Sequence, residues 1–367
     1  MSGEEQPTPD GVGVRGGDEH GTGEPGGTPA GPLDVTPAGP LGVTPAGPLG
    51  AGTFSLEGRA APGLYFVGWF GTIVGLGVIG VALLSGGQIA AAVLALVGVV
   101  LLTVGLFSAA GAQALQRRRL ATAPYAGPSP FLVFAATIPP TIVLGALAVI
   151  PLVALGVGPL DASPAALLVS LVVTTVVYVA SIRLLVVGPG ALSWRDMGLV
   201  PSGTSRWRDL AAGAALAIPI VILTSILADV LVAILGATPP SVVPLNTGTG
   251  GLILNLLSAA VVTPFGEELF FRGFATTAWV RGLGERGGLL RGALFFAVIH
   301  VLLIGGSSFD EALRAAIVGF VGRIPVSIAL GWIFLRRRSL YASIGLHATF
   351  NATLVILSEV VARNVGF

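Results

Sequence analysis

Long apolar runs separated by short polar loops recur along the chain from residue 64 onward. An α-helix needs about 20 apolar residues to cross roughly 30 Å of hydrocarbon, and most of the runs are about that long. A β-barrel would need shorter segments of alternating polarity, whereas these runs are continuously apolar. The pattern therefore predicts an all-α, polytopic transmembrane helical bundle of about nine spans. The expected spans cover residues 64–84, 88–110, 131–155, 163–187, 209–236, 250–275, 289–304, 312–335 and 340–361.

The composition agrees with a membrane protein. Hydrophobic residues make up 53% of the 367 positions, charged residues make up only 10%, and the mean hydropathy is +0.90. Soluble proteins carry about 25% charged residues. The formal net charge of +1 gives no reason to expect nucleic acid as a partner, so the expected surrounding is the lipid bilayer. The chain has no cysteine, which excludes disulfides, thiolate catalysis and cysteine-based metal sites.

Arginine clusters predict how the spans are oriented. Short cytoplasmic loops collect Lys and Arg, and the arginine clusters here follow every second predicted span, whereas the loop over residues 236–250 has none. We therefore expect a multi-pass protein of the cell membrane with a cytoplasmic N-terminus and, after nine spans, a C-terminus outside. The clusters are Arg117–Arg119; Arg195, Arg206 and Arg208; Arg281, Arg286 and Arg291; and Arg336–Arg338.

Residues 1–60 differ in composition from the rest of the chain. They are rich in Gly, Pro and Thr and contain the repeat TPAGPLDV TPAGPLGV TPAGPLG. Such a segment has too little apolar surface to offset the entropy lost on ordering. We predict a disordered cytoplasmic tail, either a slack extension or a docking tract for an unknown partner. N-terminal transmembrane helices follow over residues 61–200, and residues 201–367 form a further part that holds the motifs described next.

Three charged residues interrupt the apolar run VVTPFGEELFFRGF. An ionised side chain at mid-membrane costs roughly 2.5–3.5 kcal/mol, so such residues indicate a functional role. Glu268 and Arg272 are four residues apart with the acid first, which favours an ion pair along one helix face. Glu267 points about 100° away from that face. Because its own helix offers no partner, Glu267 is a candidate general base.

Two histidines and one amide lie in other apolar spans. His300 stands in LFFAVIHVLL, and His347 and Asn351 are four residues apart in YASIGLHATFNATLV, which places the latter two on one helix face. The third histidine of the chain, His20, belongs to the tail. We expect these motifs to lie in the cytoplasmic halves of their helices and to share one pocket with Glu267.

In order and spacing, the three motifs match a known family. EELFFRG fits the pattern E-E-x-x-x-R, FAVIH (Phe296–His300) fits F-x-x-x-H, and HATFN (His347–Asn351) fits H-x-x-x-N. Over residues 205–360 the chain resembles the CAAX prenyl protease and bacteriocin-processing (CPBP, or Abi) family of intramembrane proteases. The resemblance identifies residues 201–367 as a CPBP-type protease core.

The resemblance implies an intramembrane endopeptidase, a hydrolase that cleaves a peptide bond of a membrane-anchored protein or peptide. The implied catalytic residues are Glu267, His300, His347 and Asn351, supported by Glu268 and Arg272. Glu267 and His300 would activate a water, and His347 and Asn351 would stabilise the oxyanion. Family nomenclature calls these enzymes metalloproteases, and Glu267, His300 and His347 could ligate a divalent metal such as zinc. A metal-free, glutamate-activated water suits the same groups, and the sequence leaves both mechanisms open.

Two other functions stay open on the sequence alone. Intramembrane acids and histidines also form relays in proton-coupled transporters, although the inverted repeat typical of such carriers is not evident here. A non-catalytic membrane immunity or scaffold protein would retain the same motifs as a relic. Asp229, Arg314, Arg323 and Glu359 also lie within predicted spans and receive no role from the sequence.

Overall fold

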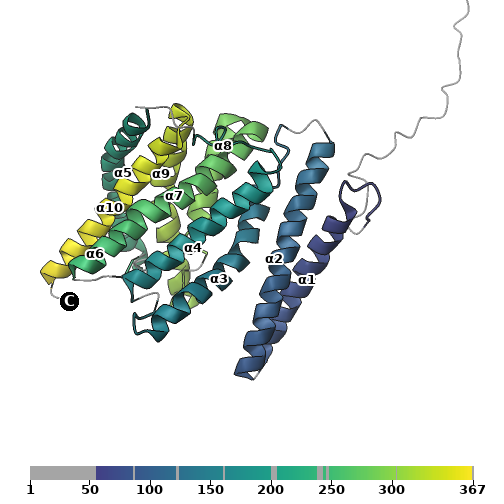
Figure 1. The fold of residues 1–367 in the computed structure, drawn as a ribbon. Coiled ribbons are helices and arrows are strands. Elements are labelled where there is room, and N and C mark those ends of the chain that lie inside the picture. The colour runs from purple at the N-terminus through teal and green to yellow at the C-terminus, as the bar shows by residue number, and fades with distance from the viewer. Residues whose placement is uncertain are drawn as a thin grey trace, which may run out of the picture. The chain divides into compact units, whose positions relative to one another are not determined.

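The computed structural model describes residues 55–85, 87–120, 124–159, 162–199, 205–237, 243–244, 248–302 and 304–365. Within these ranges every regular element is helical, which confirms the predicted all-α class. Most of the predicted tail, residues 1–60, lies outside the described residues. The helices in Figure 1 are α1 (Pro62–Leu84), α2 (Gln88–Arg119), α3 (Pro130–Ala154), α4 (Pro164–Ile182), α5 (Ser205–Leu235), α6 (Thr249–Leu256), α7 (Thr263–Glu268), α8 (Thr277–Ile299), α9 (Phe309–Arg337) and α10 (Leu340–Val365), with π-helical segments η1 (Arg183–Val187), η2 (Leu257–Val262) and η3 (Leu269–Thr276).

Eight of the described segments are long and apolar enough to cross a membrane, against about nine predicted spans. The difference lies in one 51-residue run, Thr249–Ile299, which holds the sixth predicted span and most of the seventh. Gly284 interrupts this run with φ 75° and ψ 174°, a conformation that glycine adopts without steric cost. The chain folds back there, and Phe271 packs against Phe295 with ring centroids 5.4 Å apart. The two predicted spans are therefore the two arms of one hairpin.

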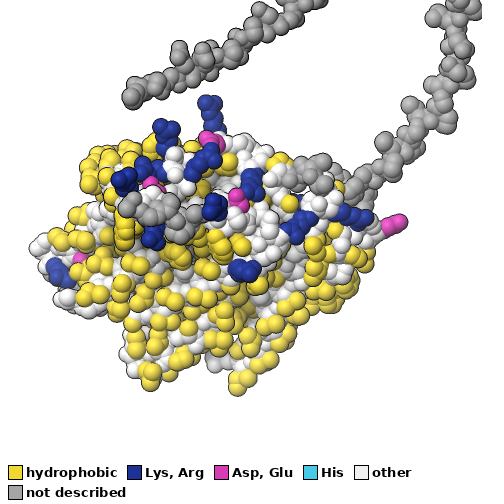
Figure 2. Space-filling view, turned by 45° about the horizontal axis from the view of Figure 1, so that its top comes forward, with side chains coloured by type: hydrophobic (Ala, Val, Ile, Leu, Met, Phe, Trp, Pro, Cys, Tyr) yellow, Lys and Arg dark blue, Asp and Glu magenta, His cyan; other side chains and the backbone are white. Residues whose placement is uncertain are grey.

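Ion pairs join the arginine-containing loops at one end of the helices, called the arginine-rich end below. Arg281 pairs with Asp196 at 2.9 Å, and Arg337 pairs with Asp209 at 2.7 Å. Burial alone would raise the pKa of the Asp196 carboxyl, but hydrogen bonds from Ser193 and the charge of Arg281 hold it below its ordinary value. Figure 2 shows arginine side chains gathered over one part of the surface, above a face that is mainly apolar.

Loops without arginine clusters meet at the opposite end. α9 begins beside the end of α5, where Arg314 donates a hydrogen bond to the carbonyl of Leu235 at 3.4 Å. The second arm of the hairpin therefore leads from Gly284, at the arginine-rich end, back to the opposite end. Counted over the described residues, the chain passes between the two ends nine times. As a result α1 begins at the arginine-rich end and α10 finishes at the opposite one.

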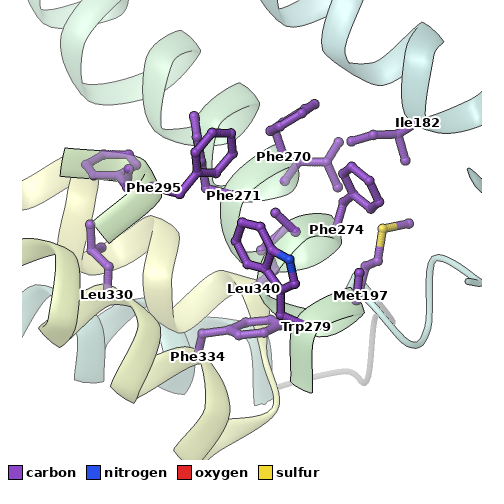
Figure 3. Packing of buried hydrophobic residues seen from close by; sticks show 14 of the residues in the cluster. Ile182, Met197, Phe270, Phe271, Phe274, Trp279, Phe295, Leu330, Phe334 and Leu340 are labelled. Carbon is purple, nitrogen blue, oxygen red and sulfur yellow. The ribbon is translucent and has the colours of Figure 1, made fainter. Parts of the chain in front are cut away.

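Aromatic side chains form the buried core around the charged segment. Phe270, Phe271 and Phe274 of η3 are each at most 1% exposed, and Figure 3 shows them together with Phe295 from the second arm. Neighbouring rings of this cluster pack edge to face or tilted, as Phe270 does on Phe274 with centroids 5.4 Å apart. Such rings bury large apolar areas and hold fixed geometries. The cluster therefore fixes the helical segment that directly follows Glu268.

A close crossing of α5 and α10 positions the last motif. A Cβ atom added to Gly213 would lie 2.0 Å from the carbonyl oxygen of Ala342, and one added to Gly345 would lie 2.2 Å from that of Leu210. Only glycine allows the two backbones to approach so closely, which is the usual role of small residues between membrane helices. Because Gly345 stands two residues before His347, this crossing sets where that imidazole lies.

Candidate active site

Glu267, His300 and His347 come together from three different helical segments. The Oε2 atom of Glu267, on α7, lies 3.6 Å from Nε2 of His300, at the end of α8. The same oxygen lies 3.9 Å from Nε2 of His347, on α10. Oε2 of Glu267 is buried and takes part in no hydrogen bond. The structure thus places one carboxylate oxygen between two imidazole nitrogens, in the shared pocket that the motifs predict.

The other nitrogen of each ring fixes the tautomer. Nδ1 of His300 lies 2.7 Å from the carbonyl oxygen of Phe296, and Nδ1 of His347 lies 2.7 Å from Oε1 of Glu268. A carbonyl and a carboxylate only accept hydrogen bonds, so both Nδ1 atoms carry the proton. In the neutral rings, the Nε2 atoms near Glu267 then hold lone pairs. Each can accept a hydrogen bond from a water or bind a cation.

Glu268 is fully buried, and its carboxylate accepts hydrogen bonds from three other side chains. Its Oε1 atom accepts hydrogen bonds from Arg272 at 2.8 Å, which confirms the predicted ion pair, and from His347. Its Oε2 atom accepts from the hydroxyl of Ser343. Ser343 was missed from the sequence, although it stands one helical turn before His347 and so shares its face. Glu268 therefore orients a histidine as well as pairing a cation.

Phe296 links the buried cation to both imidazoles. The guanidinium carbon of Arg272 lies 4.0 Å from the centre of its ring, a cation–π geometry. The same ring is tilted against His300 with centroids 4.3 Å apart, and it meets His347 edge to face at 5.8 Å. The phenylalanine of the F-x-x-x-H motif therefore supports the site through its ring and, at His300, through its carbonyl oxygen.

Asn351 lies beside the same site but has a structural bond of its own. Its Nδ2 atom donates to the carbonyl oxygen of Ala259 at 2.8 Å. Ala259 belongs to the π-helical segment η2, in which an amide bonds to the carbonyl five residues earlier. The residue that would serve Ala259 is Pro264, which has no N–H. Asn351 supplies the missing donor and keeps one further N–H for another partner.

A cavity of about 660 Å³ joins these residues. We expected the motifs in the halves of their helices nearer the arginine-rich end. His347 lies in that half of α10, and Glu267 stands about midway between Thr249 and the turn at Gly284. From there the cavity extends toward the opposite end, past Asp229 and Val232 of α5. The lining includes Leu167, Leu171, Thr224, Ala228, Asp229, Val232, Glu267, Phe296, His300, Gly319, Gly322, Arg323, His347, Asn351 and Ser358.

The donor atoms at the centre of the site match those of a catalytic zinc. Two histidine nitrogens and one carboxylate oxygen, with water as the fourth ligand, form a known ligand set for hydrolytic zinc enzymes. The unpartnered Oε2 of Glu267 and the two Nε2 lone pairs fit that chemistry. Among the described residues, however, no three His, Asp or Glu side chains stand close enough to form a ready-made metal site.

Residues 249–353 match the family model described as type II CAAX prenyl endopeptidase Rce1-like. The match is consistent with the CPBP/CAAX protease family. The matched segment contains every candidate site residue of the sequence, from Glu267 to Asn351. It is shorter than the resemblance over residues 205–360, so α4 and α5 contribute cavity walls from outside the matched range. No match was found among curated proteins or among solved structures.

Proposed function

We propose that the protein is an intramembrane endopeptidase in which Glu267 and His300 hold and activate one water beside His347. The observation that carries the proposal is the placement of Oε2 of Glu267 within 3.6 and 3.9 Å of the two Nε2 atoms, in a cavity lined by apolar helices. A carboxylate can accept a proton from the water, and the Nε2 lone pair of His300 can accept a hydrogen bond that orients it. A positioned general base contributes about 10²–10⁴ in rate.

The proposed reaction is the hydrolysis of a peptide bond. Glu267 takes a proton from the water while the oxygen of the water bonds to the carbonyl carbon of the peptide. The carbonyl oxygen becomes an oxyanion. The C–N bond then breaks, the proton held by Glu267 passes to the leaving nitrogen, and the products are an acid and an amine. Each donor to such an oxyanion is worth about 10²–10³ in rate.

The oxyanion role predicted for His347 requires its protonated form. In the neutral ring Nε2 has only a lone pair, whereas the imidazolium donates from Nε2. The carboxylate of Glu268, 2.7 Å from Nδ1, stabilises that positive charge. The second N–H of Asn351, not used by Ala259, would be the other donor.

A divalent ion is the alternative way to activate the water. Glu267, His300 and His347 would hold it, and Glu268 would orient His347 as a ligand. A bound ion of this kind lowers the pKa of its water and polarises the substrate carbonyl. Metal analysis of the purified protein, combined with chelator treatment, decides between the two mechanisms. Full activity after complete metal removal would support the glutamate-activated water, and loss that is reversed by added zinc would support the ion.

We also propose an orientation and a substrate class. The protein would lie in a cell membrane with its arginine-rich end facing the cytoplasm. The C-terminal end of α10 would then lie outside. The cavity extends away from that end, so a membrane-anchored peptide or protein would reach Glu267 from the opposite side. Topology-reporter fusions after residue 365 and at the N-terminus would show whether the two termini lie on opposite sides of the membrane.

Peptide cleavage by the full-length protein in detergent tests the proposed activity. The panel contains farnesyl-cysteine peptides of the CAAX type and matched acylated peptides, with products identified by mass spectrometry. Glu267→Gln should lower the cleavage rate about 10²–10⁴-fold, while Glu285→Gln, an exposed acid of the same hairpin, should leave it unchanged. Undiminished cleavage by Glu267→Gln would overturn the proposal, and proton-driven solute uptake by proteoliposomes would favour a carrier.

A further inference from the structure

Arg323 is a cation in the cavity wall on which Glu267 acts only at longer range than an ion pair. It lies on α9 and lines the same cavity as Glu267. Its Nη1 donates to the carbonyl of Gly319 in its own helix at 3.1 Å. Among the described residues, no Asp or Glu carboxylate lies within 4.0 Å of its guanidinium, although Glu267 and Asp229 line the same cavity.

Arg272 and Arg314, which also lie within predicted spans, are paired. Arg272 has Glu268 and the ring of Phe296, and Arg314 has Asp310. Charged residues inside membrane spans are costly and usually pair with another group or mark a ligand path. Arg323 has no such close ion pair, which leaves its guanidinium available to a negative group that enters the cavity.

Two glycines show where the guanidinium lies. A Cβ atom added to Gly319 would be 3.2 Å from Nη1 of Arg323 and 3.2 Å from Cγ1 of Val301. Val301 directly follows His300, so the guanidinium lies close to the segment that carries this imidazole. A Cβ atom added to Gly322 would meet no atom within 4 Å. The wall beside Arg323 is thus open, with room for a ligand group.

We propose that Arg323 binds a carboxylate of the substrate and so selects peptides with a negative charge close to the bond that is cleaved. The inference rests on the proposed function and adds a specificity-determining residue to it. A guanidinium matches a carboxylate with two parallel N–H donors, and the match is strongest where water is scarce. Two groups offer this chemistry: the α-carboxylate at a chain end, and the side chain of Asp or Glu.

Three peptides distinguish these sources. Each carries the same farnesyl-cysteine anchor: the first ends in a free carboxylate, the second in an amide, and the third in an amide with a glutamate as last residue. Hydrogen bonds to a charged group contribute about 1.5–3 kcal/mol, so wild type should prefer a charged peptide over the neutral amide by about 10- to 150-fold in kcat/KM. If only the first peptide is preferred over the amide, Arg323 binds the α-carboxylate. If the third peptide is cleaved equally well, Arg323 also binds acidic side chains.

Variants show whether Arg323 is the group that reads the charge. Arg323→Gln should remove the preference, chiefly by lowering kcat/KM for the charged peptides, and Arg323→Lys should keep part of it. Arg314→Gln removes an arginine of the same helix that does not line the cavity, and it should behave as wild type. Gel filtration and thermal unfolding confirm that the variants fold. If Arg323→Gln does not fold, the wild-type preference and its reduction in Arg323→Lys still decide the question.

Two results would overturn this inference and leave the proposed function standing. One is equal cleavage of all three peptides by wild type. The other is a loss in Arg323→Gln by the same factor for every peptide, which would place the guanidinium at the oxyanion instead of at a substrate carboxylate. Failure of wild type to cleave any peptide of the panel counts against the proposed function itself.

Discussion

The neighbouring acids Glu267 and Glu268 should respond in opposite ways to the same substitution. Glu268 is 0% exposed, pairs with Arg272 at 2.8 Å and accepts hydrogen bonds from Ser343 and His347. Glu268→Gln removes the charge and leaves a buried guanidinium without compensation. Breaking a buried pair in this way costs about 3–5 kcal/mol. The free energy of unfolding should fall by that amount.

Glu267→Gln removes the same charge from an atom that has no hydrogen-bond partner. Because Oε2 accepts no hydrogen bond from another protein atom, the change to an amide breaks no hydrogen bond within the protein. The free energy of unfolding of Glu267→Gln should therefore lie within about 1 kcal/mol of the wild-type value or above it, although cleavage is lost. Lost activity with retained or increased stability is the result expected if Glu267 has a catalytic role and not a structural one.

Unfolding by SDS in mixed micelles, followed by circular dichroism, gives both free energies on one scale. The double variant Glu268→Gln/Arg272→Met removes the anion and the cation together and should recover part of the stability lost in Glu268→Gln, because no unpaired charge remains. The reasoning is refuted if Glu267→Gln destabilises the protein as much as Glu268→Gln does. It is also refuted if the double variant is less stable than Glu268→Gln alone.

Three further substitutions probe the supports of the site. Asn351→Ala leaves the carbonyl of Ala259 unpaired and should cost about 1–3 kcal/mol of stability; an unchanged stability with lost activity would instead assign the amide to the oxyanion alone. Ser343→Ala removes one hydrogen bond to Glu268, so a loss of about 1.5–3 kcal/mol is expected, measured by the same titration. Gly345→Ala places a Cβ atom 2.2 Å from a backbone oxygen of α5 and should cost at least about 1–3 kcal/mol through overpacking; wild-type stability would show that the helices can move apart freely.

Much of the fold was predictable because membrane helices need only length and apolarity. Seven of the nine predicted spans each match one of the eight candidate membrane segments in the described residues, and the sixth and seventh together match the run Thr249–Ile299. The Glu268–Arg272 pair was predictable for a similar reason, since both residues lie on one helix and their spacing fixes the geometry.

The remaining features depend on contacts between helices that no local pattern encodes. Glu268 and His347 are 79 residues apart, and nothing within either motif shows that one orients the other. The donation from Asn351 to Ala259 depends on the π-helical segment before Pro264. The direction of the cavity depends on where α5 and α10 cross. For Arg323 the sequence shows a costly charge, but only the structure shows that it lines the cavity and that no described carboxylate lies within 4.0 Å of it.

The origin of the cavity walls has a consequence for how specificity can change. The acid, both imidazoles and their supports all come from residues 249–353, whereas Leu167, Leu171, Thr224 and Ala228 reach the cavity from α4 and α5. Part of the cavity wall is thus encoded outside the stretch that carries the site residues. If the proposed function holds, substitutions in α4 or α5 should change which peptides fit the cavity while Glu267, His300 and His347 keep their places.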